Sequence, residues 1–314
     1  MIAAFAPATV SNVAAGFDVL GFALDEPGDV VAAALRDEPG VAIVAITGEG
    51  GRLTHDAAKN TAGAAVQALL ALLGTSRGIA LTIHKGLPLA SGVGSSGASA
   101  VAAVVAVNEL LGRPASLDQV LRAAMAGERA GCGAAHPDNV APALLGGFVL
   151  ARSADPPDIV RLPVPAGLSC AVLHPHLEVP TGASRALLGD TVPLAAAVRQ
   201  WANLGALVSA LHTSDFELLS RSLVDHVAEP KRAVLVPGFA LVKAAALAAG
   251  ALGCSLSGSG PSVFALARSL DEARAVGSAM ASAYGEAGGG VPADLWVSAV
   301  GTTGARVITG GGPR

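Results

Sequence analysis

Residues 88–99 have the sequence PLASGVGSSGAS, and this segment constrains the fold more than any other. It holds three glycines, four serines and no charged residue. It follows GIALTIH (78–84), whose alternating pattern predicts a strand, and it leads into ASAVAAVVAVNELLG (98–112), which predicts a helix ending at Gly112. Such a loop exposes backbone N–H groups beside the positive end of a helix, an arrangement that binds anions, most often phosphate. The segment therefore predicts a phosphate site, with a flexible, serine-capped turn as the alternative.

Two common phosphate motifs are excluded. The Walker A pattern places a Lys beside Ser or Thr after its last Gly, whereas the nearest basic residue here, Lys85, precedes the loop. The Rossmann pattern fails because no acidic residue stands at the right distance in a parallel unit. Lys85 itself is interpreted as a charged residue at a strand end rather than as a phosphate ligand.

The rest of the chain predicts an α+β fold with antiparallel sheets, helices to one side and two domains. Pro-rich RSADPPD (152–158) is the best boundary, giving an N-terminal domain at 1–155 and a C-terminal domain at 156–314. The tail, GGGPR, is expected to fray. Further strands are expected at 2–8, 29–35, 41–47, 146–151, 159–164, 168–174 and 254–267, and further helices at 60–74, 116–131, 192–212, 214–223, 238–252 and 270–288.

Composition removes several classes of protein. The chain has 314 residues, of which 52% are hydrophobic and 14% charged, so a disordered chain is excluded. The net charge is −4 with no basic cluster, which argues against nucleic acid. The apolar run at 98–107 is shorter than the roughly 20 residues of a membrane span, and the N-terminus lacks a signal peptide pattern. Cys132, Cys170 and Cys254 fit neither a disulfide framework nor a zinc site, so we expect a cytoplasmic protein.

The spacing of Ser96 and Glu128 predicts a metal site. The second helix opens with a capping box from Ser116 to Gln119, and a tight turn joins it to the first. In an antiparallel hairpin of two helices of similar length, Glu128 returns beside Ser96 and the loop. One hydroxyl and one carboxylate, completed by phosphate oxygens and water, suit Mg²⁺. The alternative is that Glu128 is a solvated acid at a helix end.

Four blocks in this order resemble the superfamily of galactokinase, homoserine kinase, mevalonate kinase and phosphomevalonate kinase. PLASGVGSSGAS is similar to its central pattern, P-x-x-x-G-L-G-S-S-A, with Val93 in place of Leu and Gly97 in place of Ala. SLSGSGPSVFAL (255–266) resembles its third motif. APATVSNVAAGFDVLGFAL (6–24) and GCGAAHPDNVAPALLGGF (131–148) narrow the resemblance to the homoserine kinase family, over residues 2–301.

The resemblance implies an N-terminal domain like ribosomal protein S5 and a ferredoxin-like C-terminal domain. It implies phosphorylation of L-homoserine by MgATP to O-phospho-L-homoserine, on the route to threonine, and homodimers are common in the family. Mg²⁺ would be held by Ser96 and Glu128. Homoserine would be bound by Asn12, Asp18, His136, Asn139, Thr181, Arg185 and Arg232. ATP would be bound by Asn60 and by the loop residues Leu89, Ala90, Ser91, Gly92, Val93, Gly94, Ser95, Ser96, Gly97, Ala98 and Ser99.

The chemistry of these side chains fits an amino acid that carries a hydroxyl. An acid such as Asp18 suits an ammonium group, and two arginines suit a carboxylate through bidentate hydrogen bonds. Amide and imidazole groups orient a neutral hydroxyl. By themselves, Arg185 and Arg232 would be ordinary surface arginines, and His136 would be a turn residue.

Asn139 stands where the mevalonate kinase branch has an Asp thought to act as a base. An amide takes no proton at neutral pH, and we assign no base role to Asp138 or His136. Phosphoryl transfer depends mainly on positioning and charge stabilisation, so the pattern is still that of a kinase, with Asn139 as its positioning group beside Ser96 and Glu128.

Three other interpretations stay open. The chain could phosphorylate mevalonate or a sugar, although paired arginines argue against a neutral sugar. It could be a catalytically inactive relative that binds a ligand and regulates, although the loop, Ser96 and Glu128 are intact. A purely structural module would have no reason for four glycine-rich blocks.

Overall fold

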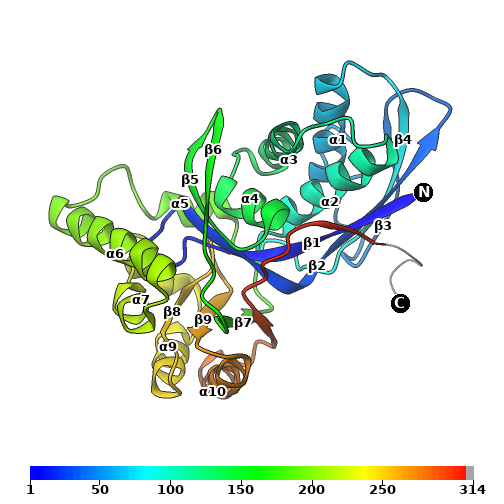
Figure 1. The fold of residues 1–314 in the computed structure, drawn as a ribbon. Coiled ribbons are helices and arrows are strands. Elements are labelled where there is room, and N and C mark those ends of the chain that lie inside the picture. Colours follow the sequence, from blue (N-terminus) through cyan, green and yellow to red (C-terminus); the bar gives the residue numbers. More distant parts are fainter. Residues whose placement is uncertain (309–314) are drawn as a thin grey trace.

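The first of two sheets carries the N-terminal half of the protein, whose computed structural model describes residues 1–308 (Figure 1). Within those residues seven strands form it in the order β11-β1-β2-β4-β3, with β5 on β2 and β6 on β5. All pairs are antiparallel except β3–β4, which is parallel because α1 crosses over between them; this one pair differs from our expectation. The strands are β1 (Ile2–Ser11), β2 (Leu20–Arg36), β3 (Val41–Thr47), β4 (Gly78–His84), β5 (Phe148–Ala154), β6 (Pro157–Leu162) and β11 (Arg306–Ile308).

Helix α2 is the centre of this half. Its residues Ser95–Leu110 are mostly Ala, Val, Ser and Gly, and 11 of the 16 are buried, against β1, β2 and the neighbouring helices. A helix that is apolar all round must lie inside the protein or in a membrane. No helix of the described chain is long and apolar enough to cross a bilayer. The helices around α2 are α1 (Thr61–Leu72), α3 (Leu117–Cys132) and α4 (Pro137–Leu145).

The second sheet has the order β10-β7-β9-β8 and is fully antiparallel. Helices α9 and α10 pack against it and bury a separate apolar core (Figure 1). Its strands are β7 (Ser169–Pro175), β8 (Gly253–Leu256), β9 (Val263–Ala267) and β10 (Ala293–Ala299). The helices of this half are α5 (Thr181–Ala186), α6 (Leu194–Thr213), α7 (Phe216–Ser222), α8 (Glu229–Arg232), α9 (Phe239–Ala248) and α10 (Leu270–Ala287), with the short 3₁₀ helix η1 (Ala233–Leu235) after α8.

The division of the chain at residue 155 stays a prediction, and two pairings bear on it. The predicted break at 152–158 forms the hairpin that joins β5 to β6, so β6 belongs to the first sheet. The chain also returns from the second sheet to the first, where β11 pairs with β1. Both pairings favour a boundary after Leu162 and a first half completed by β11. The expected fraying of the tail falls outside the described residues.

Candidate active site

The loop of residues 88–94 presents its backbone N–H groups to a cavity because its carbonyl groups are held from the other side. The carbonyls of Ala90, Ser91, Gly92 and Val93 each accept a hydrogen bond. Val179 N donates to Ala90 O at 3.3 Å, and Thr9 N donates to Val93 O at 3.1 Å. The hydroxyls of Ser262 and Ser257 donate to Ser91 O and Gly92 O, each at 2.7 Å.

In a planar trans peptide the following N–H points opposite to the carbonyl. The N–H groups of residues 91–94 are therefore turned away from these donors, and no described residue accepts a hydrogen bond from them.

Two glycines permit this path. Gly92 and Gly94 have φ of 79° and 68°, in the left-handed region that favours glycine. A Cβ at Gly92 would lie 2.5 Å from the Ser257 carbonyl oxygen, and one at Gly94 would lie 2.1 Å from Thr9 Oγ1. Gly94 is also the N-cap of α2 and provides no side chain to cap it. The free N–H groups of the first helical turn and the helix dipole thus add to the loop, and together they form an anion site.

A buried ion pair supports the loop from below. Lys85 Nζ pairs with Asp29 and donates to Ser95 O at 2.9 Å, Ser95 Oγ at 2.7 Å and Ser99 Oγ at 2.9 Å. Asp29 Oδ1 accepts from the backbone of Gly86 and Leu87. The sequence interpretation placed Lys85 at a strand end and missed Asp29, although an acid at the start of the apolar segment DVVAAAL was a signal. Lys85 lines the cavity but its charge is already paired beneath the helix start.

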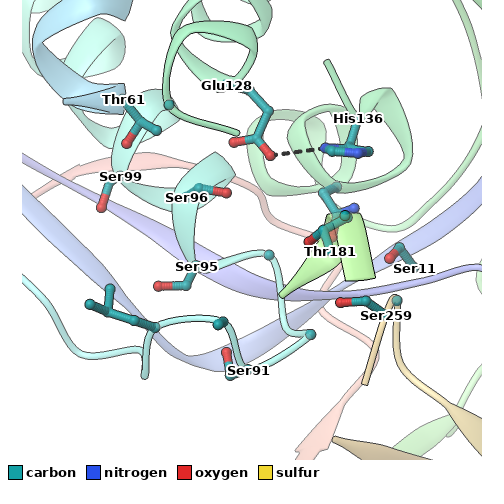
Figure 2. A pocket seen from close by; sticks show the side chains of 18 of the residues that line it. Ser11, Thr61, Ser91, Ser95, Ser96, Ser99, Glu128, His136, Thr181 and Ser259 are labelled. Carbon is teal, nitrogen blue, oxygen red and sulfur yellow. Dashed lines mark hydrogen bonds and ion pairs between the residues drawn. The ribbon is translucent and has the colours of Figure 1, made fainter. Parts of the chain in front are cut away.

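Glu128 and Ser96 line the same cavity, as the helix-hairpin argument predicts. Figure 2 shows the Ser96 hydroxyl at the start of α2 and the Glu128 carboxylate on α3 facing the same space. Glu128 is 3% exposed, and its Oε1 lies 3.2 Å from His136 Nδ1. Its Oε2 is buried and has no hydrogen-bond partner among the described residues. An unpartnered, buried carboxylate oxygen beside a hydroxyl is a donor set that fits Mg²⁺.

His136 lines the cavity and also contacts Glu128. Its hydrogen bond to Glu128 raises the pKa of the imidazole, and burial partly opposes this. The ring is therefore held first by the Glu128 carboxylate. Its Nε2 is buried without a partner among the described residues, so this nitrogen is the part of His136 left for a ligand.

The wall of the cavity also carries paired charges. Arg185 donates to both carboxylate oxygens of Asp18 at 2.8 Å, joining α5 to the segment after β1. The guanidinium groups of Arg185 and Arg232 lie 5.6 and 5.2 Å from the ring centre of Phe17. Arg232 is 3% exposed, and burial lowers the pKa of its guanidinium. An ammonium and a carboxylate on one small molecule would find complementary charges here.

Amide and acid side chains complete the wall. Asn12 accepts from the Asp18 N–H at 3.0 Å and donates to the Gly258 carbonyl at 2.9 Å, which fixes the Asp18 backbone. Asn139 Oδ1 accepts from Thr9 Oγ1 at 3.2 Å. Asp138 is 3% exposed, and burial, reinforced by the charge of Asp18, raises the pKa of its carboxyl to about 7.

Asn60 is the N-cap residue of α1. Its Oδ1 accepts from the Ala62 N–H and caps α1, while its Nδ2 donates to the Thr54 carbonyl. It lines the cavity with most of its amide already engaged.

One cavity of about 400 Å³ collects most of the predicted residues. Val93, Gly97 and Ala98 lie outside its lining, because they are buried behind the loop. Among the lining residues that sequence reasoning missed are Ser11, Thr61, Asp138 and Ser259; Ser11, Asp138 and Ser259 belong to blocks that it had singled out. The members found by both routes are Asn12, Asp18, Asn60, Leu89, Ala90, Ser91, Gly92, Gly94, Ser95, Ser96, Ser99, Glu128, His136, Asn139, Thr181, Arg185 and Arg232.

An anion cradle at a helix N-terminus, the Ser96 hydroxyl with the buried Glu128 carboxylate, and a cavity between two α+β halves define a small-molecule phosphotransferase. The chain belongs to the GHMP kinase family: residues 60–147 match the GHMP kinases N terminal domain and residues 207–287 the GHMP kinases C terminal domain. Its full-length similarity within that family is to homoserine kinases.

Two relatives and one solved structure show this similarity. Homoserine kinase of Chlorobium phaeobacteroides (strain BS1) is 50% identical, over 98% of this chain and 99% of its own. That of Chlorobaculum tepidum is 49% identical, over 98% of both. The crystal structure of homoserine kinase from Cytophaga hutchinsonii is 51% identical with a TM-score of 0.95, over 98% of this chain and 97% of that one. The predicted family and two-domain α+β fold are confirmed.

Proposed function

We propose that the protein is a homoserine kinase, which transfers the γ-phosphoryl group of ATP to the hydroxyl of L-homoserine and forms O-phospho-L-homoserine for threonine biosynthesis. The observation that carries this proposal is the cavity itself. It joins an anion cradle to a pair of opposite charges, Asp18 and Arg185, which complement the ammonium and the carboxylate of an α-amino acid. Homoserine is such an amino acid, and its hydroxyl lies at the end of a short side chain.

The N–H groups of residues 91–94 and the first turn of α2 would bind the phosphates of ATP. Ser96 and the free oxygen of Glu128 would hold Mg²⁺, which when bound neutralises charge on the phosphates. Asp18 would receive the ammonium group of homoserine, and Arg185 and Arg232 its carboxylate. The Asp18–Arg185 pair would then be exchanged for two pairs with the zwitterion, with no change in net charge.

Asn139, with Thr9 holding its carbonyl, would direct its amide N–H groups to the substrate hydroxyl. Transfer through a loose transition state depends on positioning and charge stabilisation, so the hydroxyl proton can leave late without a strong base. In this scheme Asp138 does not have to be ionised and does not have to act as a base.

A phosphorylation panel tests the function. Purified protein with MgATP and, separately, homoserine, mevalonate, galactose and shikimate should release ADP with homoserine alone. If the protein phosphorylates mevalonate or a hexose but not homoserine, the assignment of homoserine as the substrate is wrong. Absence of turnover together with ADP binding would favour the inactive, regulatory interpretation. A homodimer and a cytoplasmic location are further proposals that rest on family membership, and sedimentation tests the first.

A further inference from the structure

A hydrogen-bonded chain runs from the second sheet to the phosphate loop. His174, on β7, lies with its Nδ1 3.1 Å from Ser262 Oγ. Ser262 precedes β9, and its hydroxyl donates to the Ser91 carbonyl at 2.7 Å. His174 and Ser262 are 2% and 0% exposed. The imidazole stacks on Trp296 of β10, with ring centres 5.6 Å apart and planes 7° apart.

The direction of each hydrogen bond follows from counting protons. A backbone carbonyl only accepts, so the single proton of the Ser262 hydroxyl goes to Ser91. Nδ1 of His174 must therefore donate to Ser262. Burial lowers the pKa of His174 to about 4, so the ring is neutral near pH 7 and carries its one proton on Nδ1. The chain has one direction: His174 N–H to Ser262 O–H to Ser91 carbonyl.

We propose that His174 and Ser262 are positioning residues for nucleotide binding: from the second sheet they fix the Ser91 carbonyl, and this aims the Gly92 N–H at the phosphates. This inference rests on the proposed use of ATP at the loop. The peptide between Ser91 and Gly92 is planar, so rotating its carbonyl rotates its N–H with it. The loop is in this way oriented by groups that do not touch the ligand.

Other hydrogen bonds also hold the loop, so losing the Ser262 hydroxyl should weaken nucleotide binding without abolishing it. The Ser262 N–H also donates to the Ser91 carbonyl, at 3.2 Å, and Ser257 Oγ holds the next carbonyl. Ser262→Ala should therefore loosen the peptide without releasing the loop. The loss of one neutral hydrogen bond corresponds to weakening of about 5- to 10-fold.

Variants at two positions separate positioning from folding. Ser262→Ala removes the hydroxyl, and His174→Phe removes its donor while keeping the stack on Trp296. His174→Asn restores an N–H close to the position of Nδ1. The control is His176→Asn, because His176 is exposed and pairs with Asp294 outside the cavity.

The readouts are the Kd for ADP by calorimetry, KM for ATP and for homoserine, and the melting temperature. Ser262→Ala and His174→Phe should weaken ADP binding about 5- to 10-fold and raise KM for ATP similarly, with KM for homoserine unchanged. His174→Asn should recover most of the affinity, and His176→Asn should match wild type.

If Ser262→Ala and His174→Phe bind ADP as tightly as wild type, the inference is overturned and the proposed function stands. Equal rises in KM for ATP and KM for homoserine would have the same two consequences. Failure of His174→Asn to recover affinity would show that the donor is not what matters. A wild-type protein that does not bind ADP at all would instead overturn the proposed function, and the inference with it.

Discussion

Glu128 has one oxygen engaged by His136 and one buried without a partner among the described residues. If that oxygen holds Mg²⁺, Glu128→Gln and Ser96→Ala should each lower kcat by about 100-fold or more, since a metal stabilises transition-state charge by several kcal/mol. Affinity for ATP should fall less, because the loop N–H groups remain. Steady-state rates over a Mg²⁺ titration measure both effects.

The matched control is Glu109→Gln, which removes only an ion pair with Arg113 on the surface end of α2. It should leave kcat unchanged. Near-normal kcat for Glu128→Gln at low Mg²⁺ would contradict the metal site.

Asp138 should destabilise the folded protein at high pH. Its folded pKa of about 7 lies above the usual value near 3.8, so the native state binds this proton more tightly than the unfolded chain. The stability linked to the proton is complete below about pH 4 and is lost as pH rises through about 7. Asp138→Asn, which stays neutral, should therefore raise the melting temperature more at pH 8 than at pH 5, measured without metal or nucleotide. An equal shift at both pH values would contradict this.

The same variant tests the scheme without a base. Asp138→Asn should keep kcat within about tenfold, near 1.4 kcal/mol of barrier, whereas Asn139→Leu should lower it further by removing the group that orients the hydroxyl. Single-turnover rates on folded protein measure this. A folded Asp138→Asn enzyme with kcat lower by several orders of magnitude would identify Asp138 as the base.

At the scale of elements, the contact between α1 and α3 sets the position of Glu128. Gly127 lies at this contact, where a Cβ would come 2.4 Å from the Thr61 carbonyl oxygen and 2.5 Å from Ala65 Cβ. Gly127→Ala should push the helices apart, lower the free energy of unfolding by about 1–3 kcal/mol and reduce kcat through its neighbour Glu128. Urea titration and steady-state kinetics measure the two effects.

Gly205 in α6 is the matched control, since a Cβ there has nothing within 4 Å. Gly205→Ala should stabilise the protein by about 0.5–1 kcal/mol through helix propensity and leave kcat unchanged. If both substitutions shift stability in the same direction, the contact does not govern this part of the fold.

Local signals in the sequence predicted the long elements well. The capping box at Ser116 and Gln119 is confirmed, and α3 begins directly after it. The expected strands at 41–47 and 78–84 are β3 and β4 with the same bounds. Two of the missed helices lack such signals: α4 holds Pro142 in its interior, and α5 has only 6 residues. The strand β10 was also missed, although it has seven residues. Helix α4 forms because His136 and Pro137 start it and β1, β2 and β5 support it, which is tertiary information.

At the scale of the whole molecule, the sequence motifs predicted the blocks that meet but not how they connect. The glycine-rich block at 255–266 was identified, yet its role of holding the Ser91 and Gly92 carbonyls depends on sheet packing. Asp29 and Lys85 are 56 residues apart in sequence and pair only because β2 and β4 are neighbours. The pairing of β11 with β1 could not be predicted from local sequence either, because the two strands lie at opposite ends of the sequence.

The cavity is closed by residues from both halves, and this arrangement predicts which substrate each half controls. Arg185 and Arg232 come from the second half, and both lie over Phe17 of the first. Arg185→Met and Arg232→Met should each raise KM for homoserine by about 10- to 150-fold, the loss of roughly 1.5–3 kcal/mol from a charge-assisted pair. KM for ATP should change little, because the loop carbonyls are held by Val179, Ser262, Ser257 and Thr9 and by neither arginine. Homoserine amide, which lacks the carboxylate, should bind wild type poorly and lose little more in either variant. Equal rises in KM for ATP and homoserine would show that these arginines hold the two halves together rather than bind the carboxylate.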